Sequence, residues 1–325
     1  MLTIKRLLPV IFLGLVLMAA PSQAFAQSKP RWNSDTATIE ASGIIVQFHQ
    51  RTPQYKFWIP GENDTAVYIV KFVKIIEFID VDEDGEFDPM GDTILARAEL
   101  TAHDQWNITA AVLPGPENST ELRVVMEGYV AVITHRAGMQ EERVNVTFVN
   151  HIFDKDVSIE GYVVKGGAEL KIDVIISDWP WHNNESKLAL MILFAGHFRG
   201  EKEERAPEMH HVREEEHAMH RVEMRGDNVG AKGVFTFREN VRVRYHNGTE
   251  YEEKVNATDD FRHGSAAQYI VYPHFEGTLE HDPSILIEKE EAPTQGVLKI
   301  VTSPYLWAGA AIIAIIAGII LIRRK

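Results

Sequence analysis

Short segments rich in valine, isoleucine, tyrosine and phenylalanine recur along most of the chain, and they limit the possible fold more than any other feature of the sequence. Glycine, proline, asparagine or aspartate interrupts them, as is typical of strands joined by turns. The candidate strands are residues 44–49, 67–79, 122–133, 143–149, 157–164, 170–177, 188–194, 234–237, 241–245, 251–255 and 269–272. This pattern predicts an all-β fold, with a large two-sheet β-sandwich as the body of the protein.

The order of residue types within these segments supports individual strands. Leu170, Ile172, Val174 and Ile176 occupy alternate positions and form one apolar face of a half-buried strand. Residues 241–245 and 251–255 flank the pair Asn247-Gly248, whose tolerance of positive φ predicts a hairpin turn. Segment 67–79 is apolar on both faces, and its β-branched residues favour a central strand over a buried helix.

Two similar stretches leave open whether the sandwich consists of two related halves. Phe57-Trp58-Ile59-Pro60 and Trp179-Pro180-Trp181 each precede an Asn-x-Ser/Thr motif and then an apolar segment. An internal duplication and coincidence both explain this likeness. The aromatic side chains form either an exposed platform for sugar or protein or, as is more common, packed corners at strand ends.

The N-terminal residues 1–26 have the organisation of a secretory signal peptide. Lys5 and Arg6 precede an apolar run, residues 7–20, and Ala24-Phe25-Ala26 fits a small-residue cleavage site. We expect cleavage to leave a chain that begins near Gln27, and an uncleaved anchor is the alternative. In either case the bulk of the chain is exported.

Residues 305–322 contain no charged side chain and predict a transmembrane helix over residues 304–322. At about 1.5 Å per residue this segment extends roughly 27 Å, close to the hydrocarbon thickness of a bilayer. Residues 323–325 form a basic tail, which the positive-inside rule places in the cytoplasm. We therefore expect a single-pass cell-membrane protein whose N-terminus lies outside and whose partner is the lipid bilayer. Residues 27–287 form the extracellular ectodomain, and residues 288–303 an acidic stalk.

The charge of the predicted exported part, residues 27–302, argues against nucleic-acid binding. Removing Lys5, Arg6 and the three terminal cations from the 33 basic residues leaves 28 bases against 47 acids, a formal charge of −19. Such a surface repels phosphate and attracts cations. Envelope proteins and glycans remain as candidate partners, and nucleic acid does not.

Seven of the twelve asparagines stand in Asn-x-Ser/Thr motifs, which favours N-glycosylation of an exported surface. The acceptors are Asn63, Asn107, Asn118, Asn145, Asn184, Asn247 and Asn256. An exported domain of this size without any cysteine is unusual for a eukaryotic ectodomain, where disulfides are common. The combination suggests an archaeal surface protein.

An acidic segment, residues 80–92, gives the sharpest local signal. Its carboxylates are Asp80, Asp82, Asp84, Glu86, Asp88 and Asp92. Asp80, Asp82, Asp84, Gly85 and Asp88 fill the first, third, fifth, sixth and ninth places of a loop that resembles the calcium loop of EF-hand proteins, over about a dozen residues only. Gly91 stands where the closing carboxylate is expected, so Asp92 or Glu99 would have to replace it.

We expect this segment to be a strand-borne calcium loop with a structural role, because clustered carboxylates repel each other unless a cation compensates them. The alternative is a solvated acidic hairpin, whose aspartates and glycines serve only as turn residues.

A histidine-rich segment follows Pro207 and ends before Gly226, and its spacing predicts one short surface helix. On a helix, His210, Glu214 and His217 lie along one face, and His217 and His220 also lie close enough to share zinc or a similar metal. No His-Glu-x-x-His motif occurs, and solvated histidines above an apolar stripe are the alternative.

No motif identifies an enzyme. A cysteine nucleophile is excluded, and neither Gly-x-Ser-x-Gly nor Gly-x-Gly-x-x-Gly occurs. The sequence therefore predicts a glycosylated, calcium-stabilised surface protein with a structural or binding role. The alternative is a metal- or carboxylate-dependent surface hydrolase, which an open groove lined by converging carboxylates or histidines would favour.

Overall fold

The computed structural model describes residues 30–61, 66–101, 106–134, 142–198, 206–215, 218–226, 230–261 and 266–289. The chain divides into two compact units, Met1–Glu288 and Lys289–Lys325. The predicted signal peptide, transmembrane helix and tail, and the stalk beyond Lys289, lie outside the described residues. Within the described ranges, no helix has the length and apolar character that a membrane span requires.

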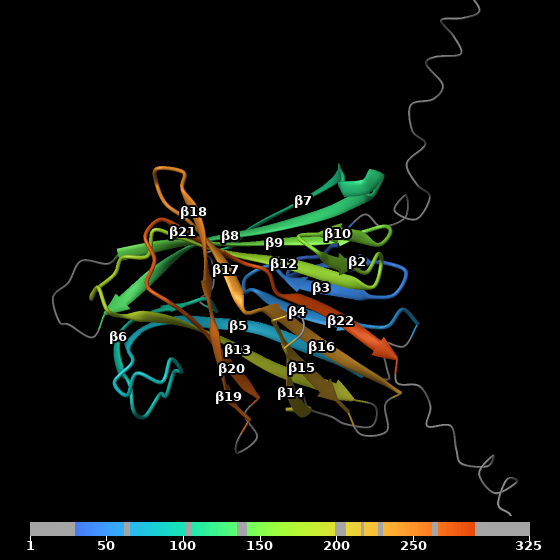
Figure 1. Ribbon diagram of the computed structural model, residues 1–325. Helices are drawn as coiled ribbons and strands as arrows, with labels where there is room; N and C mark the ends of the chain where they lie inside the picture. The colour runs from blue at the N-terminus through green and yellow to red at the C-terminus, as the bar shows by residue number, and fades with distance from the viewer. Residues whose placement is uncertain are drawn as a thin grey trace, which may run out of the picture. The chain divides into compact units, whose positions relative to one another are not determined.

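The first unit consists of antiparallel strands, which confirms the all-β prediction (Figure 1). The strands are β1 (Arg31–Trp32), β2 (Thr36–Glu40), β3 (Ile45–His49), β4 (Gln54–Trp58), β5 (Ala66–Ile79), β6 (Thr93–Glu99), β7 (Trp106–Pro114), β8 (Thr120–Thr134), β9 (Glu142–Phe153), β10 (Val157–Ile159), β11 (Tyr162–Val164), β12 (Glu169–Ser177), β13 (Lys187–Phe198), β14 (Glu208–Glu214), β15 (Met219–Arg225), β16 (Ala231–Arg238), β17 (Asn240–Arg244), β18 (Glu250–Lys254), β19 (Asn256–Asp260), β20 (Ala267–Tyr272), β21 (Thr278–His281) and β22 (Ser284–Lys289). One turn of 3₁₀ helix, η1 (Pro116–Asn118), precedes β8.

The strands form one hydrogen-bonded network with two branches, and only β10 and β11 pair separately. The first branch runs in the order β1, β2, β3, β4, β5, β13, β20, β19. The second runs in the order β7, β8, β9, β12, β21, β17, β18. Strand β12 also pairs with β22, and from there the order continues through β16 and β15 to β14. Strand β6 pairs with both β5 and β8 and joins the branches.

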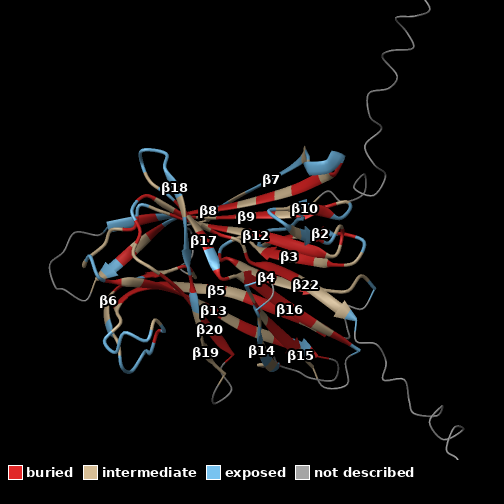
Figure 2. Ribbon diagram, in the orientation of Figure 1, coloured by how far each residue is buried: buried red, intermediate tan, exposed pale blue. Residues whose placement is uncertain are grey.

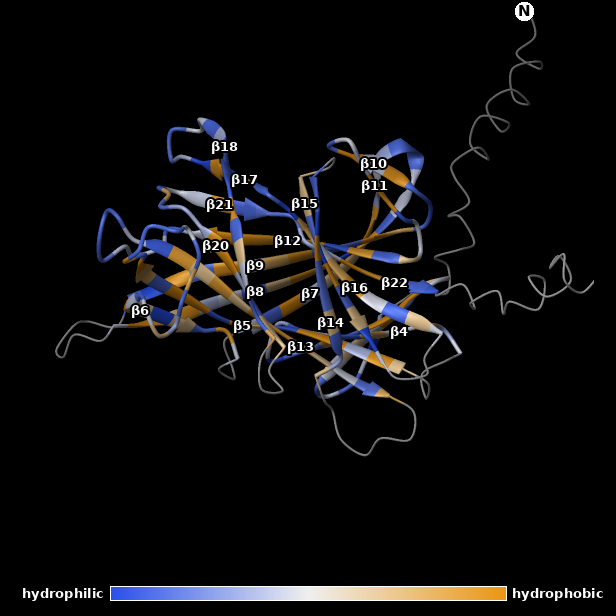
Figure 3. Ribbon diagram, turned by 60° about the horizontal axis from the view of Figure 1, so that its bottom comes forward, coloured by the Kyte–Doolittle hydropathy of each residue, from blue (hydrophilic) through white to orange (hydrophobic). Residues whose placement is uncertain are grey.

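The main core lies between the two branches, where their apolar faces meet (Figure 2). Phe72 on β5 shows the contact, because its ring centroid lies 4.8 Å from that of Phe148 on β9 and 6.3 Å from that of Phe235 on β16. All three rings are buried. Hydrophobic and hydrophilic residues alternate along strands such as β12 (Figure 3), so one face of such a strand is left for polar groups.

Most predicted strands are present, and several are longer than expected. Segment 67–79 is the central strand β5, which pairs with β4, β6 and β13. The predicted hairpin around Asn247-Gly248 joins β17 to β18, and Gly248 has φ +85°. Segment 157–164 is not one strand, because Glu160 (φ 51°) and Gly161 (φ 80°) turn the chain back between β10 and β11. Two successive positive φ values are typical of a type I′ turn.

The predicted surface helix is wrong. Residues 208–214 and 219–225 form the hairpin β14–β15, whose second strand also pairs with β16. Val222 and Met224 alternate into the core, and this period-two burial together with the ladder to β16 outweighs the helical spacing of the histidines. The described residues contain no α-helix.

The aromatic stretches pack into corners rather than forming an exposed platform. Tyr55, Phe57 and Trp179 are buried. The Trp179 Nε1–H donates to the carboxylate of Glu77 at 3.1 Å, and the Ser186 hydroxyl donates to the same carboxylate at 2.7 Å. The buried Glu77 therefore fixes the loop that joins β12 to β13.

We expect Phe72→Ala to lower the free energy of unfolding by about 3–5 kcal/mol, because it leaves a cavity between the two branches. Chemical denaturation of the purified chain measures this loss. Val112→Ala on β7 is the control, since Val112 is exposed and its loss should change stability by less than about 0.5 kcal/mol. Equal effects of the two substitutions would contradict the assigned core.

Candidate functional site

The acidic segment is the loop between β5 and β6, and the structure brings three of its six predicted ligands together. One ligand oxygen from each of Asp80, Asp82 and Asp84 lies within 4.8 Å of the other two. This is the separation that a group able to hold a metal ion requires. Partial desolvation and the neighbouring carboxylate of Asp84 raise the pKa of Asp82, so negative charge in this group is uncompensated at its exposed end.

Asp80 is the buried member of the group, since its side chain is 4% exposed. Its Oδ2 accepts from the Gly85 N–H at 2.9 Å and from the Lys187 ammonium at 2.6 Å. Its Oδ1 is buried and has no hydrogen-bond partner. A buried carboxylate oxygen without a partner is costly, and a cation bound by the three aspartates would satisfy it.

Glu86, Asp88 and Asp92 do not join this group. Asp92 instead accepts from the Val81 N–H at 3.1 Å and from the Asp88 N–H at 2.8 Å. Asp88 accepts from the Met90 N–H at 2.9 Å. These two side chains therefore act as turn residues that bind backbone N–H groups of the loop. The grouped carboxylates are confined to its first half.

Contacts with β19 and β20 hold the loop against the domain. Phe87 is buried, with its ring 4.8 Å from Phe78 and 5.0 Å from Tyr269. The Asn256 amide donates to the Gly85 carbonyl at 2.9 Å. A Cβ at position 85 would lie 2.4 Å from the Asn256 amide nitrogen, and φ is +81°, so glycine is required there. The loop is thus anchored on both sides of the aspartate group.

The histidine segment does not assemble the predicted transition-metal ligands. His210 and Glu214 share one face of β14, and strand alternation places them on the face opposite to His220. His217 lies outside the described residues. A pair that the sequence did not indicate forms instead: His211 Nε2 lies 2.9 Å from His220 Nδ1. Burial and the neighbouring His211 lower the pKa of His220 to about 4.

The six glycosylation candidates that the structure describes all have exposed side chains, and Asn63 lies outside the described residues. They are Asn107, Asn118, Asn145, Asn184, Asn247 and Asn256. Asn145 occupies the polar face of β9, as its alternation predicts. The described acceptors are therefore at the surface, and the amide of Asn256 also donates to the Gly85 carbonyl of the acidic loop.

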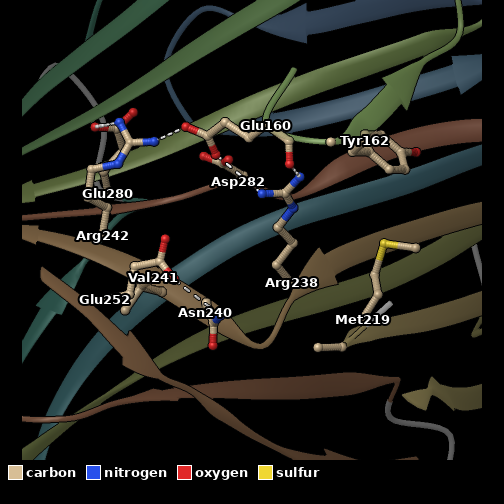
Figure 4. Close-up of a pocket in the computed structure, with 12 residues that line it drawn as sticks. Glu160, Tyr162, Met219, Arg238, Asn240, Val241, Arg242, Glu252, Glu280 and Asp282 are labelled. Carbon is tan, nitrogen blue, oxygen red and sulfur yellow. Dashed lines mark hydrogen bonds and ion pairs between the residues drawn. The ribbon is translucent and has the colours of Figure 1, made fainter. Parts of the chain in front are cut away.

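A polar groove crosses the outer face of the second branch beneath the β10–β11 hairpin. Two cavities of about 280 Å³ and 200 Å³ adjoin here and share Glu160, Arg242, Glu280 and Asp282 in their walls. Figure 4 shows the larger one, with Glu160 from the hairpin turn facing Arg238 and Arg242. The side chains come from strands that are far apart in the sequence, and the pairing of these strands brings them together.

Three basic residues stand in lateral register at the smaller cavity, and two of them, His151 and Lys171, line it. Arg123 on β8 pairs with His151 on β9, and His151 pairs with Lys171 on β12. Like charges directly opposite each other are destabilising. Glu121 and Asp173, each two residues away along its strand, lie between them: His151 Nδ1 is 2.7 Å from Glu121, and Nε2 is 2.9 Å from Asp173. Only the imidazolium form donates to both carboxylates.

The charges in the groove set each other's pKa. Burial opposes protonation of His151, but the carboxylates of Asp173 and Glu121 outweigh it and raise the pKa of His151. Burial acts against ionisation of Asp173, but His151 and Lys171 outweigh it and lower its pKa. Burial and the nearby Asp173 raise the pKa of Glu280. The groove thus holds carboxyl groups with pKa values displaced in opposite directions.

Two arginines hold the hairpin turn over the groove. Arg238 donates to the Glu160 carbonyl at 2.9 Å and to its carboxylate at 3.2 Å. Arg242 forms an ion pair with the same carboxylate and lies 3.8 Å from Glu280. At the base of the hairpin, Val157 on β10 and Val164 on β11 pack with Phe153 in a small cluster.

This groove was hardly predictable from the sequence. Lys171 and Asp173 stand at polar positions of a predicted strand, and this was the available signal. The neighbours of this strand, β12, are set by the pairings among β8, β9, β12 and β21. These pairings depend on the whole topology and are not visible in one segment of sequence.

No known protein family matches the chain, and no curated protein is similar to it in sequence. The groove and the acidic loop are therefore interpreted from their own geometry.

We expect the contribution of His151 to stability to fall as pH rises. Its folded pKa is raised above the unfolded value, so the contribution is complete below about pH 6.5 and is lost as pH passes the folded pKa. His151→Gln should therefore lower the free energy of unfolding by about 2 kcal/mol near pH 5.5 and by less near pH 9, as measured by chemical denaturation. His210→Gln on the exposed side of β14 is the control and should have little effect at either pH. A loss of stability that grows toward alkaline pH would contradict the contacts of protonated His151 with Glu121 and Asp173.

Proposed function

We propose that the chain is a membrane-anchored cell-surface β-sandwich with a structural or binding role in an archaeal envelope, and that calcium stabilises it. The observation that carries the calcium role is the group of Asp80, Asp82 and Asp84 around a buried, unpartnered Asp80 oxygen. Oxygen ligands from carboxylates are the type that calcium prefers. Because the loop joins two strands of the core network, a bound cation would stabilise the domain rather than switch it.

The surface location is supported by sequence and exposure together. The apolar segment 304–322 ends in a basic tail, and the first 26 residues have the pattern of a signal peptide. Six described Asn-x-Ser/Thr acceptors are exposed. The two branches that flank one core are compatible with a sandwich of two sheets.

Calcium should raise the melting temperature of the full-length chain in detergent. A ligand at 100 times its Kd adds about 2.7 kcal/mol, which corresponds to roughly 5–10 °C for a domain of this size. Differential scanning calorimetry with and without millimolar calcium measures the shift.

The matched variants are Asp82→Asn, which removes a group member, and Asp35→Asn, an exposed aspartate outside the loop. Asp82→Asn should abolish most of the shift, and Asp35→Asn should retain it. Equal shifts in all three proteins, or none in the unmodified chain, would remove calcium from the proposal.

The surface location predicts that protease added to intact cells removes the ectodomain. Immunoblotting with an antibody to residues 27–287 reports the loss, and enzymatic deglycosylation should increase gel mobility. Full protection of an unmodified chain in intact cells, with cleavage only after lysis, would reject this location.

A second candidate function is a carboxylate-dependent surface hydrolase, and the groove favours it. Glu280 and Asp173 have pKa values displaced in opposite directions, which is the arrangement of an acid and a base. Hydrolysis of chromogenic ester, amide or glycoside substrates by the chain, lost in Glu280→Gln, would support it. Turnover that Glu280→Gln leaves unchanged would rule out this assignment.

A further inference from the structure

The groove beneath the β10–β11 hairpin is lined by charged groups that form ion pairs with each other, six carboxylates against Lys171, Arg238, Arg242 and His151. Apart from Glu252, each aspartate, glutamate, lysine, arginine and histidine that lines the two cavities lies within ion-pair distance of an opposite charge. The pairs are Glu121 with Arg123 and His151, Asp173 with His151 and Lys171, Asp282 with Lys171, Glu160 with Arg238 and Arg242, and Glu280 with Arg242.

We infer that this groove binds a neutral saccharide, an assignment that rests on the binding role proposed above but not on calcium. The excess of carboxylates disfavours an anion, and each carboxylate except that of Glu252 already has a cationic partner, which weakens the attraction of the groove for a further cation. The paired groups still offer hydrogen bonds, because a carboxylate accepts at several positions and a guanidinium donates through five N–H groups. Hydroxyl groups both donate and accept, so a polyhydroxylated ligand meets both kinds of partner.

The environment makes these hydrogen bonds selective. Lys171 and Asp173 have side chains 10% and 15% exposed, and His151 is 12% exposed. Their mutual ion pairs fix their positions before a ligand arrives, which lowers the ordering cost of binding. Buried polar groups that lose water without gaining a partner penalise an apolar ligand.

Apolar surface is also present in the walls. Met219 lines the larger cavity, Tyr162 lines the larger one and a third, narrow cavity that also touches Lys171, and the buried Phe153 backs the smaller one. Sugar rings have apolar C–H faces as well as hydroxyl edges, and aromatic or thioether groups pack against such faces. The groove therefore matches both surfaces of a sugar.

The size of the groove points to a short oligosaccharide rather than a large ligand. Each cavity, about 280 Å³ and about 200 Å³, is below the common range of roughly 300–1,000 Å³ for drug-sized ligands. The two adjoin at Glu160, Arg242, Glu280 and Asp282, so neighbouring sugar units would occupy neighbouring cavities.

Binding of the full-length chain in detergent to an array of oligosaccharides tests the inference. The array carries neutral glucose, mannose and galactose oligomers beside sulfated, phosphorylated, carboxylated and amino sugars. We expect binding to neutral oligomers and no preference for the charged ones. Isothermal titration calorimetry with the best neutral oligomer then gives the affinity.

Arg242→Gln and Glu280→Gln should each weaken this affinity at least tenfold, because each removes a wall residue common to both cavities. Arg244→Gln is the matched control: Arg244 lies two residues along on the same strand, pairs with Glu250 and lines neither cavity. Circular dichroism and the melting temperature verify that each variant is folded.

Loss of binding in both groove variants, with retention in Arg244→Gln, supports the inference. Absence of neutral-sugar binding, selective binding of charged sugars, or equal binding by all three variants overturns it. Asp82→Asn should bind sugar normally at low temperature, so a failed calcium site and a failed sugar site give different results.

Discussion

Strict alternation along β8, β9 and β12 is the constraint on which the rest of the structure depends. These strands place Met126, Phe148 and Ile172 in the core, so every second side chain must face outward. Register then fixes Arg123, His151 and Lys171 beside each other. Their repulsion is tolerable only with carboxylates between them, and the charged groove is the direct result of how the core is packed.

The fold class and many strands were predictable, because burial imposes a two-residue period that is visible in the sequence. Segment 67–79 and the Asn247-Gly248 hairpin are examples, since each depends on local pattern or local turn chemistry. The hairpin β14–β15 was not predictable in the same way. Spacing of His210 and Glu214 fits a helix as well as a strand, and the ladder with β16, a distant interaction, decides between them.

The candidate sites show the same difference between local contacts, which were predictable, and contacts between distant strands, which were not. Asp80, Asp82 and Asp84 are neighbours in sequence, so a turn alone brings them together. The partners that hold this loop, Lys187 on Asp80 and Asn256 on the Gly85 carbonyl, come from other strands and were not foreseen. In the groove, charged residues that pair across strands are far apart in the sequence, as Arg242 and Glu160 are. Analysis of one strand at a time does not detect such pairs.

Glu160 has a consequence for the choice of residue at the hairpin turn. Its φ of 51° is a left-handed conformation that disfavours a glutamate by about 1–2 kcal/mol, whereas asparagine or glycine adopts it readily. The glutamate carboxylate, however, reaches both Arg238 and Arg242. Asparagine would relax the backbone but, being one methylene shorter, would release the tip. The strained glutamate therefore gives up backbone stability for two side-chain ion pairs, which add to the Arg238 bond to its carbonyl in holding the turn over the groove.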